Sequence, residues 1–170
     1  MSSLRFSLVQ QAFEILSGEN QRKIVNHSLP SSVRWKSGAT AGKVNSYWSD
    51  FGRTLVATSE NLDLNALLDA DGATISWDLI KLVLIRNRNL VAGEDLTWGP
   101  ATVEGWGVGA IVKDGSDRRI VPAGRTPKDR GIDFWVDPIG HAVVNNASDK
   151  IFLDAGSNTV VFDILVIGTD

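Results

Sequence analysis

Residues 79–85, Leu-Ile-Lys-Leu-Val-Leu-Ile, constrain the fold of this chain more than any other segment. Alternate side chains of an extended strand point to opposite faces, so this segment is apolar on both faces and is interrupted only by Lys81. Residues 159–168 have the same design, with Asp163 as the one charge. Such strands need apolar cover on both sides. We therefore expect a two-layer β fold in which Lys81 and Asp163 are cross-strand neighbours on adjacent antiparallel strands.

From residue 51 onward, short runs of apolar residues alternate with turns rich in Gly, Pro, Asn and Asp. This spacing predicts an all-β fold, an antiparallel β-sandwich of jelly-roll type, rather than alternating strands and helices. Residues 65–69 are expected to form one helical turn, and residues 69–72 a turn with Gly72 at positive φ. The expected strands are residues 53–57, 61–64, 79–85, 95–98, 108–112, 118–121, 132–136, 142–145, 150–153 and 159–167.

The N-terminal part of the chain differs from the rest in charge. Residues 1–50 hold six Lys or Arg against three Asp or Glu, a net charge of +3, whereas the remainder carries −6. Leu4, Phe6 and Leu8 alternate as in a strand, and the next residues fit either its continuation or a brief helix. We interpret residues 1–50 as a partly extended arm that docks onto its own domain or onto a neighbouring subunit, and residues 51–170 as the sandwich domain.

Composition narrows the range of partners. A net charge of −3 argues against a general nucleic-acid binder, which needs clustered Lys and Arg to neutralise phosphates. The absence of cysteine excludes disulfides and thiolate metal sites. No uninterrupted apolar stretch approaches the roughly 18 residues that span a bilayer. We therefore expect neither nucleic acid nor a membrane as a partner.

No motif in the sequence indicates catalysis or cofactor binding. Residues 38–44 differ from a phosphate-binding loop, because three residues instead of four separate the glycines and Val44 lacks a hydroxyl group. The two histidines, His27 and His141, lack metal-ligand spacing, and no Gly-x-Ser-x-Gly is present. No feature of the sequence indicates a pair of carboxylates that would cleave a glycan. We expect no catalytic residue, cofactor or metal.

The candidate contact residues are aromatic and basic. Trp98 and Trp106 flank a glycine-rich stretch, where exposed rings would stack on a sugar or anchor a protein interface, and where packing beneath a loop is the alternative. Residues 118–130 hold five cations mixed with Asp, which fits a solvated loop or a surface facing an acidic partner. The candidate partner contacts are Arg5, Arg22, Lys23, Arg34, Trp35, Trp98, Trp106 and Arg125.

Several segments of the chain together resemble a known group of proteins. They are Trp-Ser-Asp-Phe-Gly-Arg-Thr-Leu at 48–55, Glu-Asn-Leu-Asp-Leu at 60–64, Asp-Gly-Ala-Thr-Ile-Ser-Trp at 71–77 and Ile-Lys-Leu-Val-Leu-Ile-Arg-Asn at 80–87, with Phe-Asp-Ile-Leu-Val-Ile-Gly at 162–168. The pattern resembles a group of small virion proteins of tailed bacteriophages over about residues 45–168. Members often have a Pro-Gly-Gly turn where this chain reads Val-Pro-Ala-Gly at 121–124.

The resemblance implies a non-enzymatic β-sandwich that serves as a building block of a virion. It implies a capsid decoration (cement) or head-fibre protein, present as a symmetric homo-oligomer, with a homotrimer as the expected state. Its expected partners are further copies of itself and the major capsid protein or another virion protein. The alternative is a tail-fibre module that recognises host surface carbohydrate through Trp98 and Trp106.

Overall fold

A computed structural model describes residues 43–69, 71–126 and 130–170 of the chain, together with the backbone of four N-terminal strands. Ten further elements follow those four strands in the chain. The strands are β1 (Arg5–Val9), β2 (Ala12–Ser17), β3 (Asn20–Val25), β4 (Lys36–Ser37), β5 (Lys43–Val44), β6 (Ser46–Val56), β7 (Ser59–Asp63), β8 (Leu79–Asn87), β9 (Leu96–Pro100), β10 (Arg119–Val121), β11 (Ile132–Ala142), β12 (Lys150–Asp154) and β13 (Thr159–Thr169), and one 3₁₀ helix, η1 (Leu64–Ala66), follows β7.

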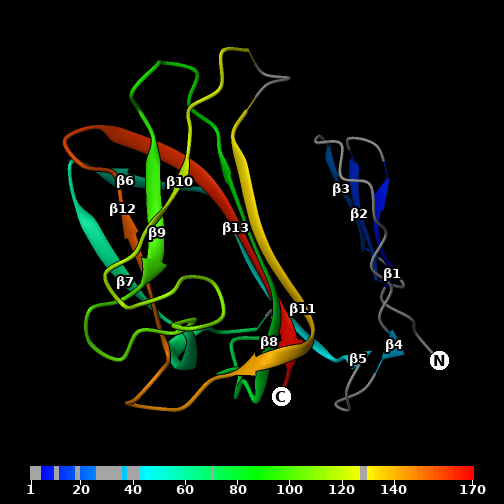
Figure 1. Ribbon diagram of the computed structural model, residues 1–170. Coiled ribbons are helices and arrows are strands. Elements are labelled where there is room, and N and C mark those ends of the chain that lie inside the picture. The colour runs from blue at the N-terminus through cyan, green and yellow to red at the C-terminus, as the bar shows by residue number, and fades with distance from the viewer. Residues whose placement is uncertain are drawn as a thin grey trace.

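Strands β6 to β13 form two four-stranded antiparallel sheets that pack face to face (Figure 1). The long sheet has the strand order β11-β8-β13-β6, and the short sheet has the order β10-β9-β12-β7. The pairs β6 with β13, β7 with β12, β8 with β11 and β9 with β10 are nested like one long hairpin rolled into two layers. This is the jelly-roll arrangement, so the all-β sandwich expected from the sequence is confirmed.

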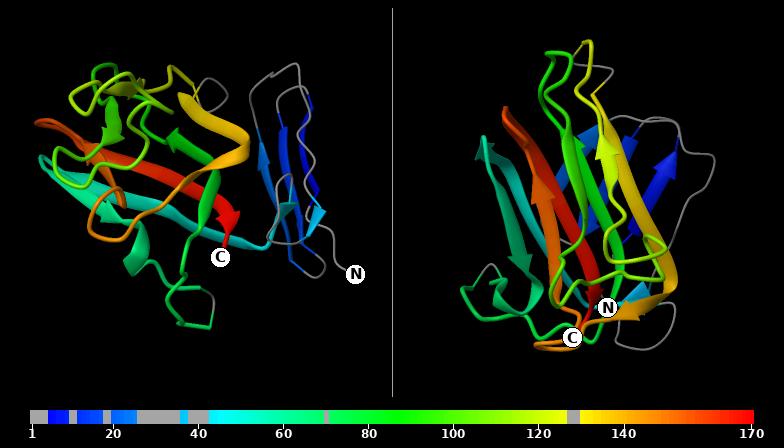
Figure 2. Two further views of the ribbon diagram at one scale, coloured as in Figure 1. Left: turned by 60° about the horizontal axis from the view of Figure 1, so that its bottom comes forward. Right: turned by 60° about the vertical axis from the view of Figure 1, so that its left-hand side comes forward.

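The remaining strands lie at the N-terminal end of the chain. Strands β1, β2 and β3 form an antiparallel three-stranded meander, and β4 pairs in parallel with β5. Strand β6 begins at Ser46 and pairs along its length with β13, so the sandwich starts before the expected boundary at residue 51. Figures 1 and 2 show the meander on the side of the long sheet that faces away from the short sheet.

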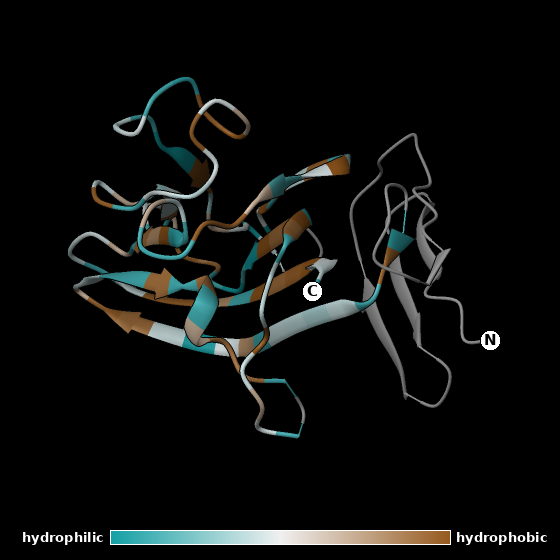
Figure 3. Cartoon of the chain, turned by 90° about the horizontal axis from the view of Figure 1, so that it is seen from below, coloured by the Kyte–Doolittle hydropathy of each residue, from teal (hydrophilic) through white to brown (hydrophobic). Residues whose placement is uncertain are grey.

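The core between the two sheets is built from the alternation of the strands. On β13, Val160, Phe162, Ile164 and Val166 face the short sheet and are fully buried. Figure 3 shows hydrophobic colour along this strand, which ends at the C-terminus. Opposite them, the short sheet contributes buried residues of β9, β12 and β7, so the interior is closed by side chains from every strand pair. The core side chains that join β13 from other elements include Leu62, Ile80, Val83, Ile85, Leu96, Trp98, Ile151 and Leu153.

Several local expectations are confirmed. The turn at 69–72 has Gly72 at φ +82°, and the Asp69 carboxylate accepts hydrogen bonds from the backbone amides of Asp71 and Ala73 at 2.9 and 2.8 Å. The short helix, η1, begins one residue before the expected turn, and Asp63 caps it by accepting from the amide of Asn65 at 2.9 Å. These carboxylates have the local role expected of acids in turns.

Three other expectations are wrong. One is the strand expected at residues 142–145, since β11 ends at Ala142 and residues 145–147 form a turn. Residues 108–112 form consecutive turns instead of a strand, because Gly107 and Gly109 adopt positive φ and the amide of Ile111 bonds back to the carbonyl of Gly107 at 2.7 Å. Strands β8 and β13 are adjacent and antiparallel, but Asp163 pairs with Arg86 instead of Lys81. Lys81 is an extra residue in β8, because Ile167 pairs with Leu82 and Gly168 pairs with Ile80.

Candidate functional site

The space between the two sheets is filled by large aromatic side chains. Trp98 and Trp106 have no exposed surface, and Trp77 and Trp135 are also buried. The Trp106 ring meets the rings of Trp135 and His141 edge to face, at centroid distances of 5.2 and 5.6 Å. Such edge-to-face packing is the favoured geometry for aromatic pairs. The interior is therefore a packed hydrophobic core at these positions.

A charged cluster fixes Trp98 where the two sheets meet. The Trp98 indole nitrogen donates to Asp133 Oδ2 at 2.8 Å, and Arg119 Nε donates to the same oxygen at 2.6 Å. Arg119 also lies over the Trp98 ring, 5.6 Å from its centroid. Because Arg119 belongs to the short sheet and Asp133 to the long sheet, this ion pair links the edges of the two layers. Its role is structural.

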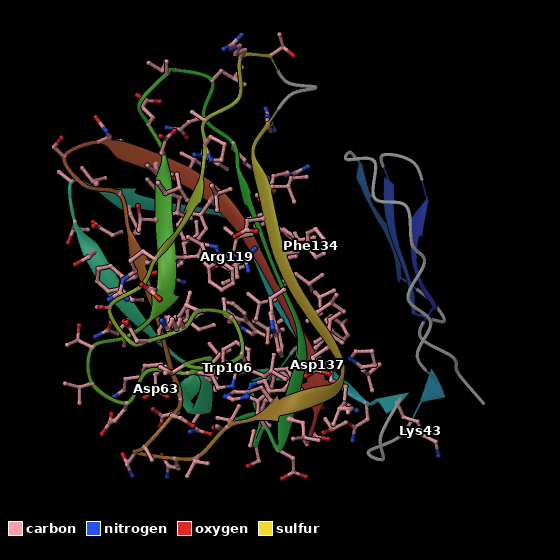
Figure 4. All side chains as sticks on the ribbon, in the orientation of Figure 1. Lys43, Asp63, Trp106, Arg119, Phe134 and Asp137 are labelled. Atoms are coloured by element: carbon pink, nitrogen blue, oxygen red, sulfur yellow. The ribbon has the colours of Figure 1, made fainter. Side chains whose placement is uncertain are left out.

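These positions correct one expectation about the tryptophans. Both rings are enclosed, so the alternative in which Trp98 and Trp106 present exposed faces to a sugar does not describe this structure. Trp106 instead packs beneath the loop of residues 101–118. Its backbone amide donates to the carbonyl of Lys150 at 2.9 Å, which holds the loop against β12. Figure 4 shows Trp106 and Arg119 between the two layers.

The other predicted contact residues are scattered or undescribed. Arg125 is exposed in the loop between β10 and β11. Arg5, Arg22 and Lys23 lie in β1 and β3, whose backbone alone is described. Arg34 and Trp35 lie outside the described residues. The structure therefore does not bring the predicted contacts together into one described site.

A different surface stands out instead, on the face of the long sheet that points away from the short sheet. We call it the outer face. Three rows of side chains cross it, and the register of β11, β8, β13 and β6 aligns them. The rows are Phe134, Leu84, Leu165 and Ser49; Val136, Leu82, Ile167 and Tyr47; and Ile132, Arg86, Asp163 and Phe51. Figure 4 shows Phe134 on this outer side of β11.

The side chains in the middle of the outer face are as fully buried as those of the sandwich interior. Leu82, Leu84, Leu165 and Ile167 have at most 1% of their surface exposed, while Phe51, Ile132, Phe134 and Val136 around them are half-buried. Within the described residues, Val44 of β5 is the one member of this cluster that lies outside the long sheet. A second apolar face of this extent on a sandwich is a surface that needs a partner.

One end of the outer face is ionic. Asp163 is 1% exposed and accepts a hydrogen bond from Arg86 Nε at 2.7 Å, while Arg88 Nε forms an ion pair with its other oxygen at 2.6 Å. The backbone amide of Gly52 donates to Asp163 Oδ1 at 2.9 Å. Gly52 has φ +77° and is the extra residue where β6 bulges against β13, so its amide turns toward the carboxylate. The buried charge is therefore fully compensated.

The opposite end of the outer face receives the chain from the N-terminal region. The Lys81 ammonium group has no exposed surface and donates to the backbone carbonyl of Lys43 at 2.5 Å. Burial lowers the pKa of Lys81 below its ordinary value, and the nearby Asp137 charge opposes that shift. Beside it, Asn45 Nδ2 donates to the Asp170 carboxylate at 2.5 Å, and the Asp170 amide donates to Asn45 Oδ1 at 3.1 Å. These contacts fix where β5 enters the face.

The described residues offer few chemical groups beyond these contacts. They contain no cluster of three or more His, Asp or Glu placed to hold a metal ion. Among the same residues, no helix has the length and apolarity to cross a membrane. His141, the one histidine among them, packs against Trp106.

Comparisons with models of protein families, with curated proteins and with solved structures gave no significant match. The virion family suggested by the sequence therefore stays a prediction. The outer face was indicated only in part by the sequence, through strands that are apolar on both sides. Its ionic end was missed, because the pairing of Asp163 with Arg86 depends on the bulges that set the strand register.

Proposed function

We propose that this chain is a non-enzymatic structural component of a bacteriophage virion, a capsid decoration or head-fibre protein that assembles as a symmetric homo-oligomer. The observation that carries the proposal is a jelly roll with two apolar faces on one sheet, one of them buried inside the sandwich and the other on its outside. Viral capsid proteins, lectins and cupins are common users of the jelly-roll fold. The fold alone does not select among them.

The packing of the interior supports the building-block role over the other two uses. A cupin-like site needs polar or metal-binding side chains inside the sandwich, whereas here Trp98, Trp106 and Phe162 fill that space. A lectin-like site built on aromatic rings needs exposed rings, and the two tryptophans expected to serve are enclosed. The resemblance of residues 45–168 to small phage virion proteins supports the same conclusion.

The outer face supports the building-block part of the proposal, because a further layer has to cover it, either the chain's own arm or another subunit. Interfaces between permanently associated proteins resemble a hydrophobic core cut in half, with charged residues displaced from the centre. The outer face has this form, because Leu82, Leu84, Leu165 and Ile167 occupy its centre and the Asp163 cluster lies at one end. The expected partners are further copies of this chain and the major capsid protein or another virion protein.

Immunogold electron microscopy of purified phage particles that carry this chain tests the proposal. We expect label over the head, and a non-immune antibody on the same grids serves as the control. Label confined to the tail tip would replace the decoration role with the receptor-binding alternative. Particles free of label, although their lysate contains the chain, would reject a virion role.

Sedimentation velocity of the purified chain tests the oligomeric part separately. We expect a homotrimer whose sedimentation coefficient does not change on dilution through the micromolar range, since permanent virion subunits associate tightly. A single species with the mass of one 18.4 kDa chain at all concentrations would contradict self-assembly.

A further inference from the structure

We infer that the N-terminal meander β1–β3 packs on the outer face of the long sheet of the same chain. The inference bears on the proposed function, because the apolar outer face is part of the observation that carries it, and cover by the chain's own meander would place the contacts between copies on other surfaces. Electron microscopy tests the virion role and cross-linking tests this cover, so the two can fail separately. The inference begins from burial. The four central side chains of the face are enclosed although the short sheet lies on the opposite side of the strands that carry them.

The meander has a pattern that complements this face. Its register pairs Leu8 with Phe13 and Phe13 with Ile24, which makes an apolar row across all three strands, and the neighbouring row pairs Phe6 with Ile15 and Ile15 with Arg22. These positions share one face of the meander because side chains alternate along a strand. A small sheet with an apolar face gains independent stability by packing that face on another layer.

The other face of the meander is mixed, with one apolar row, Val9, Ala12 and Val25, and two rows that carry polar or charged residues. The row adjacent to Leu8, Phe13 and Ile24 consists of Ser7, Glu14 and Lys23, which pair with one another across the three strands. A cross-strand Glu and Lys pair is favourable on a solvated face. The meander therefore has one face suited to a dry contact, and the sequence positions of that face are predominantly aromatic or branched aliphatic.

The path of the chain brings the two surfaces together. Val44 of β5 belongs to the outer-face cluster, and the buried Lys81 holds the preceding carbonyl at the same end of the face. The chain therefore leaves toward its N-terminus from the outer face itself. Figures 1 and 2 show β1–β3 of the same chain on this side of the sandwich, so a second copy is not needed to cover the outer face.

Photo-cross-linking of the full-length chain tests the inference. The photoreactive amino acid p-benzoylphenylalanine replaces Phe134, which is half-buried on the outer face. The same replacement at Ile120, 63% exposed on β10 of the short sheet, is the matched control. Equal amounts of isotopically heavy and light chain are unfolded together in urea and refolded as a mixture before illumination, and cross-linked peptides are identified by mass spectrometry. Circular dichroism confirms that each variant is folded, and Tyr47, at the other edge of the outer face, is the second probe position.

We expect the Phe134 probe to capture peptides from residues 5–25, only in heavy–heavy or light–light pairs, and the Ile120 probe to capture none of them. Mixed heavy–light pairs would overturn the inference in favour of a meander exchanged between copies. Captured peptides from elsewhere, or none, at both Phe134 and Tyr47 would overturn it in favour of another cover.

A substitution in the meander provides an independent check. Phe13→Asp introduces a charge into the apolar row, and we expect it to lower the yield of the Phe134 cross-link several-fold. Glu14→Gln, in the neighbouring polar row, is the control and should leave the yield unchanged. An equal yield in both variants would overturn the proposed orientation of the meander.

Discussion

The two faces of the long sheet share the same strands but differ in composition. The inner face is apolar along its length and packs against Trp98 and aliphatic side chains of the short sheet. The outer face is apolar in its middle and carries compensated charges at both ends, Asp163 with its arginines and Lys81 with the Lys43 carbonyl. The inner face therefore closes the fold, whereas the outer face combines apolar area with polar anchors that fix one orientation of whatever covers it.

The largest expected effect lies on the inner side. Trp106→Ala removes a fully buried indole that packs against Trp135 and His141, and we expect the free energy of unfolding to fall by about 4 kcal/mol. Urea denaturation measures this change. The control is Trp106→Phe, which keeps a ring and removes an indole N–H that has no hydrogen-bond partner among the described residues, so its cost should be much smaller. Equal costs for the two variants would show that the site tolerates a cavity.

Breaking the ionic end of the outer face should cost somewhat less. Asp163→Asn leaves Arg86 and Arg88 without their shared carboxylate, and removing one partner of a buried ion pair typically costs about 3 kcal/mol. Urea denaturation again gives the value, with the exposed Asp71→Asn as the control. A change within the error of that control would mean that solvent reaches the cluster and replaces the carboxylate.

A pair of neighbours on β13 compares the two faces directly. Ile164 faces the inner core and Leu165 the outer face, and both are fully enclosed. We expect Ile164→Ala to cost about 3 kcal/mol and Leu165→Ala about 2 kcal/mol, because the layer over the outer face can adjust to the smaller side chain. Chemical denaturation of the two variants under identical conditions gives the ratio. A negligible cost for Leu165→Ala would show that the outer face is uncovered in solution.

The sequence predicted the sandwich because period-two alternation on 79–85 and 159–168 is a strong signal, and because Gly and Asp mark the turns. It placed the tryptophans less well. Trp98 and Trp106 lie beside glycines, which suggested exposed loops, yet both rings point inward, and one of them is held by an ion pair between residues distant in sequence. Burial of a loop side chain depends on tertiary packing, which local composition does not determine.

The strand register could not be predicted from the sequence either. Counting along regular strands puts Ile80, Leu82 and Leu84 on one face, but Ile80 belongs to the inner core while Leu82 and Leu84 belong to the outer face. The extra residue at Lys81 reverses the alternation, and residues 137–140 of β11 form a matching irregularity between Val136 and His141. Residues 79–85 contain neither Gly nor Pro, the residue types that commonly mark a bulge. The expected Lys81–Asp163 contact was wrong for this reason.

The bulge at Lys81 gives rise to the smallest of the expected effects, which depends on pH. Burial lowers the pKa of Lys81 below 10.5, so between the folded-state pKa and 10.5 the unfolded chain binds more protons than the folded chain. The contribution of Lys81 to the free energy of unfolding should therefore rise with pH in this alkaline window and level off above it. We expect the difference between the unmodified chain and Lys81→Met to increase as the pH rises toward 10.5 in urea denaturation. Lys150→Met is the control, since the hydrogen bond with Glu104 raises the pKa of Lys150 above 10.5, so its contribution should stay constant up to pH 10.5 and be lost only above it. A pH-independent difference for Lys81→Met would mean that water reaches the ammonium group, and with it the end of the outer face where the N-terminal region enters.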